Sequence, residues 1–181
     1  YVDVEAKLNT IWGDMYKNIA NVNNIIINLD KMNDNSMRYY NLYKGEALGI
    51  RAFMHFDLLR LYTANIQNNE NAEGLPYSVK FELSPSSFSS AAKVYEYIIA
   101  DLLAAEDLLA KDVEYFTNPK VNPTEPFLRD RETHFNLYAV QATLARVYLN
   151  MGDKANAAKY AQKVVDSNKF KLMTANDFAT D

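Results

Sequence analysis

The chain has 181 residues, of which 49% are hydrophobic, and this length suits one domain with a substantial core. A net charge of -4 without any basic cluster excludes a general affinity for nucleic acid, which needs clustered Lys and Arg. No cysteine is present, which excludes disulfides, thiolate nucleophiles and cysteine-ligated zinc, and no apolar run reaches the length of a membrane-spanning helix.

Residues 4–29 are predicted to form a long amphipathic helix, because apolar residues recur there at three- and four-residue intervals. These residues are Val4, Leu8, Ile11, Trp12, Met15, Ile19, Val22, Ile26 and Leu29. Six asparagines between Asn9 and Asn28 lower the intrinsic helix propensity, so tertiary packing must hold this helix. Trp12 is either a core anchor on this stripe or an exposed platform for a sugar ring, and its helical spacing favours the core.

Residues 37–63 are predicted to form a central helix. The run KGEALGIRAFMHFDLLRLYT is apolar on almost every side, which is typical of a helix covered by its neighbours. Its polar residues are therefore informative. Arg51 and His55 lie one turn apart on one face, and Asp57 and Arg60 can pair at three-residue spacing.

The two histidines have a functional and a structural interpretation. His55 beside Arg51 or Asp57 could act as a proton shuttle, whereas a buried helical histidine is far more often hydrogen-bonded within the core. His134 lies at the start of a later helix, so the two histidines make no HxxxH or HExxH zinc site. With no nucleophile or metal set beside either one, we expect no catalytic residues, no metal and no cofactor.

A long irregular loop is predicted over residues 64–89, and loops of this length in a helical domain are usually functional or disordered. Residues 65–73 are polar. Residues 74–83 contain alternating apolar positions and are expected to lie extended against the helices. Tyr77 and Phe81 in this part either plug the loop onto the scaffold or contact a ligand.

Residues 90–110 are predicted to form the next helix, capped by Ser89 or Ser90 through a side-chain oxygen. Its buried stripe comprises Val94, Tyr95, Ile98, Leu102, Ala105 and Leu109. The charged residues of the helix are expected to form a solvated face rather than a paired-carboxylate site, because they are spread along it without a partner elsewhere. They are Lys93, Glu96, Asp101 and Asp107.

Residues 111–132 are predicted to form a second irregular loop, in which three prolines break helical structure. Three aromatic residues, Tyr115, Phe116 and Phe127, stand in this otherwise polar segment. Their rings either tuck into the core or offer a stacking surface for a ligand, and both interpretations are consistent with the sequence.

Two further helices are predicted at residues 134–151 and 154–168. Gly152 and Asp153 separate them, so the two helices meet across a very short turn and must lie antiparallel. Small and apolar residues line their facing sides: Leu144, Ala145, Tyr148, Ala157, Tyr160, Ala161 and Val164. This order matches the tetratricopeptide repeat, a helix pair that stacks on similar pairs. The predicted fold is therefore all-α, with stacked antiparallel helix pairs and two long irregular loops.

Several motifs in a fixed order give the chain a more specific resemblance. They are Gly45-Glu46-Ala47-Leu48, Arg51-Ala52-Phe53, Phe56-Asp57-Leu58, Arg60-Leu61-Tyr62, Gly74-Leu75-Pro76-Tyr77, Val94-Tyr95, Ile98-Ile99-Ala100-Asp101-Leu102, Ala105-Glu106, Leu144-Ala145-Arg146-Val147-Tyr148-Leu149, Gly152-Asp153 and Val164-Val165-Asp166-Ser167-Asn168 through Phe178. Together they resemble the SusD/RagB family of outer-membrane lipoproteins of Bacteroidetes. The resemblance runs from about Trp12 onward and covers the helical part of that family.

The resemblance implies a non-enzymatic protein on the extracellular face of the outer membrane, which captures an oligosaccharide for a TonB-dependent transporter of the SusC type. It implies that the helical part acts as a scaffold and as the docking side for the transporter. The chain starts at Tyr1 rather than Met, and we expect residues 1–181 to be a single helical domain within a longer protein. Any attachment to the membrane is expected through a lipid anchor absent from this chain.

The residues alone are compatible with two functions. Sugars bind flat aromatic faces and side-chain amides, and the loop residues Tyr77, Phe81, Tyr115, Phe116 and Phe127 are the candidate ligand contacts. The alternative is a tetratricopeptide-like scaffold that binds a peptide or protein along its helices without carbohydrate. An enzyme is the least favoured class, because the sequence contains no GxGxxG or GKS phosphate cradle and no GxSxG elbow.

Overall fold

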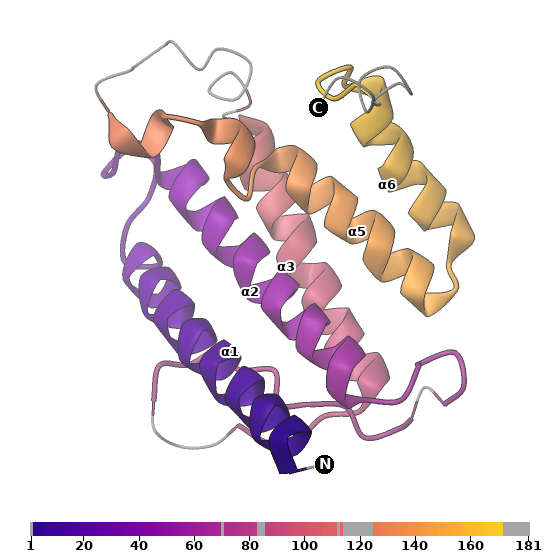
Figure 1. The fold of residues 1–181 in the computed structure, drawn as a ribbon. Helices are drawn as coiled ribbons and strands as arrows, with labels where there is room; N and C mark the ends of the chain where they lie inside the picture. Colours follow the sequence, from indigo (N-terminus) through magenta and orange to yellow (C-terminus); the bar gives the residue numbers. More distant parts are fainter. Residues whose placement is uncertain (1, 70, 83–85, 112, 114–124, 172–181) are drawn as a thin grey trace, which may run out of the picture.

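The computed structural model describes residues 2–69, 71–82, 86–111, 113 and 125–171. Within these residues the chain forms five α-helices and two short 3-10 helices, and every α-helix lies within about three residues of its predicted bounds (Figure 1). The all-α prediction is confirmed. The α-helices are α1 (Val2–Leu29), α2 (Tyr40–Tyr62), α3 (Ala91–Lys111), α5 (Leu137–Met151) and α6 (Lys154–Asp166). The 3-10 helices are η1 (Pro126–Leu128) and η2 (Arg131–Thr133).

The central position predicted for the second helix is confirmed, because α1, α3 and α5 all pack against α2. A helix with neighbours on several sides must be apolar around most of its circumference. Ala52, Phe56, Leu58 and Leu59 of α2 are accordingly buried almost completely. The polar residues Glu46, Arg51 and His55 are buried on the same helix.

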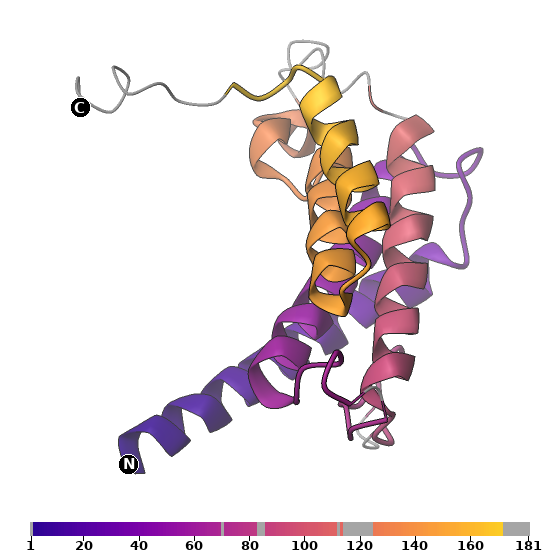
Figure 2. The ribbon, with the colours of Figure 1, turned by 90° about the vertical axis from the view of Figure 1, so that its right-hand side faces the viewer.

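The helices are arranged as two antiparallel pairs, α2 with α3 and α5 with α6, and α5 packs on α3 to join them (Figures 1 and 2). The α1 helix lies on the outer side of α2, and its N-terminal part extends beyond the other helices (Figure 2). This stacking of helix pairs is the arrangement that the tetratricopeptide-like pattern predicted.

The turn between α5 and α6 is specified by residues at the helix ends. Asn136 caps α5 by accepting hydrogen bonds from main-chain N–H groups of its first turn. Gly152 ends the helix with a φ of 85°, a left-handed conformation that glycine adopts without a steric penalty. Asp153 then caps α6. Across the pair, the rings of Tyr148 and Tyr160 stack with centroids 5.6 Å apart.

The first long loop begins at Thr63 and returns to the helices near Gly74. An antiparallel bridge joins Glu73 to Ser90, and the Gly74 amide donates to the Ser89 carbonyl. Leu75 is completely buried. The prediction that this part of the loop lies extended against the helices is therefore correct for the residues from Gly74 to Ser78.

Trp12 belongs to the core side of α1. Its ring is half-buried and lies 4.8 Å from the ring of Tyr16 and 4.9 Å from that of Tyr62, measured between centroids. The Tyr62 hydroxyl donates to the Leu8 carbonyl, which ties the end of α2 to the start of α1. The core interpretation of Trp12 matches this packing.

Close approach of α2 and α3 at Gly45 generates a first prediction. A Cβ at this position would lie 2.6 Å from Cγ of Leu109 and 3.3 Å from the carbonyl oxygen of Ala105. Gly45→Ala should therefore lower the free energy of unfolding by about 1–2 kcal/mol, because overpacking exceeds the gain in helix propensity. Urea denaturation followed by circular dichroism measures this change.

The matched control is Gly13→Ala in α1, where a Cβ meets no atom of the described chain within 4 Å. That substitution should raise the free energy of unfolding by about 0.5–1 kcal/mol through helix propensity alone. Equal effects of the two substitutions would contradict the close contact between α2 and α3.

Candidate functional site

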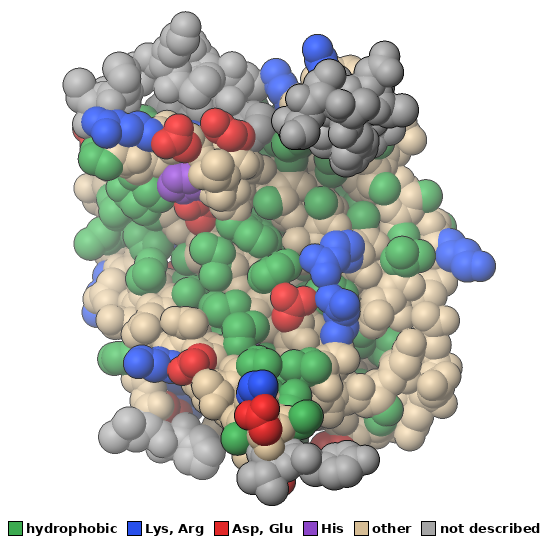
Figure 3. Space-filling view, in the orientation of Figure 1, with side chains coloured by type: hydrophobic (Ala, Val, Ile, Leu, Met, Phe, Trp, Pro, Cys, Tyr) green, Lys and Arg blue, Asp and Glu red, His purple; other side chains and the backbone are tan. Residues whose placement is uncertain are grey.

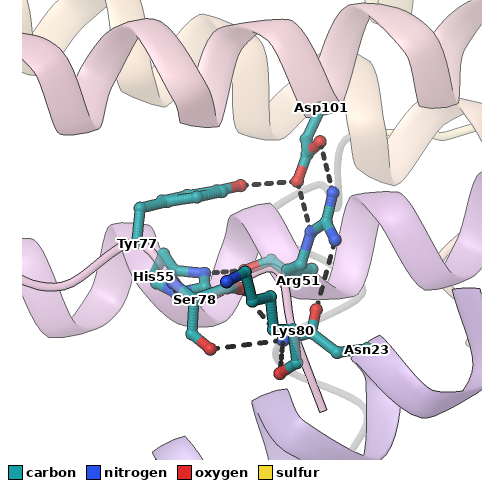
Figure 4. A network of polar contacts seen from close by, with 7 residues as sticks. All are labelled: Asn23, Arg51, His55, Tyr77, Ser78, Lys80 and Asp101. Carbon is teal, nitrogen blue, oxygen red and sulfur yellow. Dashed lines mark hydrogen bonds and ion pairs between the residues drawn. The ribbon is translucent and has the colours of Figure 1, made fainter. Parts of the chain in front are cut away.

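A buried ion pair between α2 and α3 forms the centre of a polar network (Figure 4). Arg51 donates from Nε to one carboxylate oxygen of Asp101 at 2.7 Å and from Nη2 to the other at 2.8 Å. The two side chains are only 8% and 14% exposed. Burial opposes the charge of Arg51, but the hydrogen bonds and attraction of Asp101 outweigh it and raise the pKa of Arg51.

Asn23 of α1 connects this ion pair to the first long loop. Its Oδ1 accepts from Nη1 of Arg51 at 3.1 Å. Its Nδ2 donates to the carbonyl oxygens of Ser78 at 3.0 Å and Lys80 at 3.1 Å. A completely buried side chain thus satisfies polar groups from α2 and from the loop at the same time.

Tyr77 and His55 complete the network on its other side. The Tyr77 hydroxyl donates to Oδ2 of Asp101 at 2.5 Å, and its ring stacks on the His55 ring at a centroid distance of 4.0 Å. The Ser78 amide donates to Nε2 of His55 at 3.1 Å, while Nδ1 lies 2.8 Å from the Arg51 carbonyl. Because Nε2 accepts and Nδ1 must donate, His55 is the neutral tautomer that carries its proton on Nδ1.

Burial moves the pKa values of both rings in the network away from neutral pH. Burial lowers the pKa of His55 to about 3, because the charged imidazolium would lose its hydration. Burial also raises the pKa of Tyr77 well above its ordinary value. The arrangement therefore holds structure, which favours the structural interpretation of His55.

The network fixes which side of the loop faces outward. Tyr77 is buried, whereas Phe81, four residues later, is 55% exposed and Val79 is also exposed. Lys80, between them, is held through its carbonyl oxygen by Asn23. Two aromatic residues grouped in the sequence analysis therefore differ: Tyr77 is a core residue with no open face, and Phe81 presents its ring outward from an anchored segment.

Phe127 belongs to a second cluster at the other end of α2. Its ring stacks on that of Tyr43 with centroids 4.0 Å apart, and the Arg131 guanidinium lies 4.8 Å from its centroid. Arg131 pairs with Glu46 and donates from Nη1 to Nδ1 of His134 at 3.0 Å. Phe127 is half-buried, so one part of its ring packs on Tyr43 and another part reaches the surface. Tyr115 and Phe116 lie outside the described residues.

One expectation for α3 is wrong. Glu96 and Asp107 are solvent-exposed as predicted, but Asp101 is not part of a solvated face. It lies between Arg51 and Tyr77, because the extended segment of the loop covers this side of α3. Asn23 is the second network residue that the sequence analysis missed. Its position four residues after Ile19 and three before Ile26, on the apolar stripe, was the available signal.

The described part of the chain contains neither a metal-binding cluster nor a membrane-spanning helix. No group of three or more His, Cys, Asp or Glu side chains there is arranged to hold a metal ion. No described helix combines the length and the hydropathy needed to cross a bilayer.

Comparison with known proteins identifies the family of the chain. The model of a SusD-like family, described as starch-binding and associating with the outer membrane, matches residues 1–149. A SusD-like protein P2 of Formosa agariphila is 29% identical over 97% of this chain and 31% of its own length.

Solved structures agree with this relationship. A SusD superfamily protein of Bacteroides thetaiotaomicron superposes with a TM-score of 0.74 at 28% identity, covering 92% of this chain and 34% of its own. A candidate sugar-binding protein of Bacteroides vulgatus gives the same TM-score at 26% identity, covering 94% of this chain and 36% of its own. The chain thus spans about a third of the length of these relatives.

The ion pair at the network centre generates a second prediction. Asp101→Asn should lower the free energy of unfolding by about 2–3 kcal/mol, because it leaves the buried Arg51 charge without a counter-ion. The control is Asp107→Asn on the same helix, which breaks an exposed ion pair with Lys111. It should change the free energy of unfolding by less than about 0.5 kcal/mol. Chemical denaturation of both variants measures the difference, and similar values would show that the network contributes little.

The neutral state of His55 generates a third prediction. The pKa of His55 is 6.5 in the unfolded chain and about 3 in the folded chain. The neutral histidine therefore stabilises the folded chain above pH 6.5, and this contribution is lost as the pH falls below that value. Between pH 7 and pH 5 this loss should be about 2 kcal/mol. Chemical denaturation at both pH values measures the free energy of unfolding. Its decrease from pH 7 to pH 5 should be smaller by that amount in His55→Gln than in the unmodified protein. An unchanged pH dependence would mean that His55 is accessible to protons in the folded chain.

Proposed function

Because this chain belongs to the SusD-like family, we propose that it is the helical part of a cell-surface glycan-binding protein in an outer-membrane uptake system. The ligand is an oligosaccharide, bound by the whole protein, and the protein delivers it to a TonB-dependent transporter of the SusC type. The segment acts as a scaffold that holds binding loops in place, and it catalyses no reaction.

The observation that carries this proposal is the anchored segment with an exposed aromatic ring. Sugar-binding sites are largely pre-formed and combine apolar faces with a few polar groups that fix orientation. Asn23, His55 and Asp101 hold residues 77–80 in place before any ligand arrives. Phe81 then presents its ring to solvent next to that anchor. Pre-ordering of this kind lowers the entropy lost on binding.

A surface between α1 and α2 supports the docking part of the proposal. A groove of about 400 Å³ is lined by Ile11, Met15, Leu58 and Leu61 together with Asp57 and Arg60. Ile11 and Leu61 are both exposed. Hydrophobic side chains gather over α1 and α2 in the space-filling view (Figure 3). Contiguous exposed apolar side chains of this kind mark protein–protein contacts, and we assign this face to the transporter.

The second candidate function is a protein-interaction scaffold without carbohydrate binding. The same groove between α1 and α2 favours it, because a helix-lined apolar groove also accepts a peptide or a helix of another protein. In both cases we place the protein on the extracellular face of the outer membrane, held by a lipid anchor in the longer protein.

Replacement of the exposed ring tests the glycan proposal. In the longer protein that contains this segment, Phe81→Ala should weaken oligosaccharide affinity about tenfold, because one apolar stacking face is lost. The control is Phe88→Ala, which removes a ring of nearly equal exposure, 56%, outside the segment held by the network. Isothermal titration calorimetry with the oligosaccharides found by a glycan array measures both affinities.

A second readout, co-purification of the transporter, separates the two candidate functions. Reduced glycan affinity with normal transporter association supports the ligand role of Phe81. Binding of the transporter without binding of any glycan by the unmodified protein would instead support the interaction scaffold.

A further inference from the structure

A polar pocket lies where α2 and α5 end and α3 begins. Figure 1 shows these three helix ends. Its volume is about 220 Å³, and Arg60, Thr63, Asn65, Tyr95 and Asn150 supply its polar lining. Leu59 and Ala64 complete the wall. None of the network residues Asn23, Arg51 and Asp101 lines this pocket. The pocket and the groove between α1 and α2 share one lining residue, Arg60.

The charge of the pocket is positive. Among the described residues that line it, Arg60 is the one ionised side chain and none is a carboxylate. Arg60 donates from Nη1 to Oδ1 of Asp57 at 3.1 Å, while its Nε and Nη2 bind no acceptor among the described residues. Arg146 also lies 3.9 Å from Asp57, so two guanidinium groups share one carboxylate. Arg60 therefore retains both charge and donors for an anion.

The neutral groups of the pocket are held in place by hydrogen bonds. The buried Tyr95 hydroxyl donates to Oδ1 of Asn150, and burial raises its pKa to about 12, so it remains protonated. The Gln67 side chain donates to the Asn150 carbonyl at 2.9 Å and fixes the start of the long loop at the rim. With its Oδ1 occupied, Asn150 keeps its amide donors, which have no acceptor within the described chain.

The size of the pocket limits its occupant. A volume of about 220 Å³ equals that of roughly seven water molecules at about 30 Å³ each, which accommodates one sugar ring. It is smaller than the roughly 300–1,000 Å³ typical of sites for drug-sized ligands. A longer chain must therefore extend out of the pocket into solvent.

We propose that this pocket binds a single carboxylate-bearing sugar unit, such as a hexuronic acid, within a larger glycan. The proposal rests on the proposed glycan-binding function and adds a charge preference to it. The free Nε–Nη2 edge of Arg60 matches a carboxylate in bidentate geometry, and the amides of Asn150 and Asn65 match ring hydroxyls. A neutral sugar offers Arg60 only uncharged oxygen acceptors, which bind a guanidinium more weakly than a bidentate carboxylate does, and this difference provides the selectivity.

The test compares methyl glucuronide, methyl glucoside and sodium acetate as probes of the longer protein that contains this segment. Titrations followed by ¹⁵N NMR should shift the side-chain amide signals of Asn150 and Asn65, with at least about tenfold tighter binding of the glucuronide than of either other probe. Arg60→Gln should abolish this preference, whereas Arg146→Gln should retain it. Arg146 is the matched control, because it shares Asp57 as a partner and does not line the pocket.

Three outcomes would overturn the proposal. Equal affinities for glucuronide and glucoside would remove the charge preference, and equal affinities for glucuronide and acetate would reduce the pocket to a general anion site. No shift of the Asn150 amide up to tens of millimolar glucuronide would show that the pocket is not a sugar site. Any of these results is compatible with glycan binding by the longer protein at Phe81, so failure of the pocket and failure of the proposed function remain distinguishable.

Discussion

The buried charge of Arg51 is the constraint on which the rest of the structure depends. A guanidinium in the interior of a small helical domain is costly unless every donor is satisfied. Its partners come from α3 and α1, and its own carbonyl oxygen accepts from His55, which in turn accepts from the loop at Ser78. Each surrounding element therefore contributes one contact at a defined position. We infer that apolar packing holds these helices together and that the polar contacts fix their register.

The helices could be predicted from the sequence because each has a buried face that repeats with the helical period. Their ends were less accurate where a local conformation decides the boundary. The second helix begins at Tyr40 instead of residue 37, because Tyr39 adopts a left-handed φ of 61°. The α5 helix begins at Leu137 instead of residue 134, because the Asn136 side chain caps it there. A left-handed residue and a capping side chain each act at a single position, so they leave no period in the sequence.

The candidate site was only half predictable for a related reason. The pattern of α2 placed Arg51 and His55 on one face, but Arg51 finds Asn23 and Asp101 at separations of 28 and 50 residues. The hydrophobic pattern of a sequence identifies which face of a helix is buried. It does not identify which distant residues cover a polar side chain. Asp101 therefore looked like a solvated acid, although Tyr77 covers it. The aromatic residues of the loop likewise indicated core packing or ligand contact. The sequence could not show that the ring of Tyr77 is buried and that of Phe81 exposed.

The long loop is tied to the helices near its start and again in its middle, and this has a functional consequence. Near its start, Gln67 binds the end of α5, and in its middle Ser78 and Lys80 bind α2 and α1. These residues lose their conformational entropy when the chain folds, so ligand binding does not require a further loss from them. The side chains that face solvent, such as Phe81, can then vary without disturbing the anchors. A scaffold of this kind can present different recognition groups on one fold, which matches the proposed role in glycan capture.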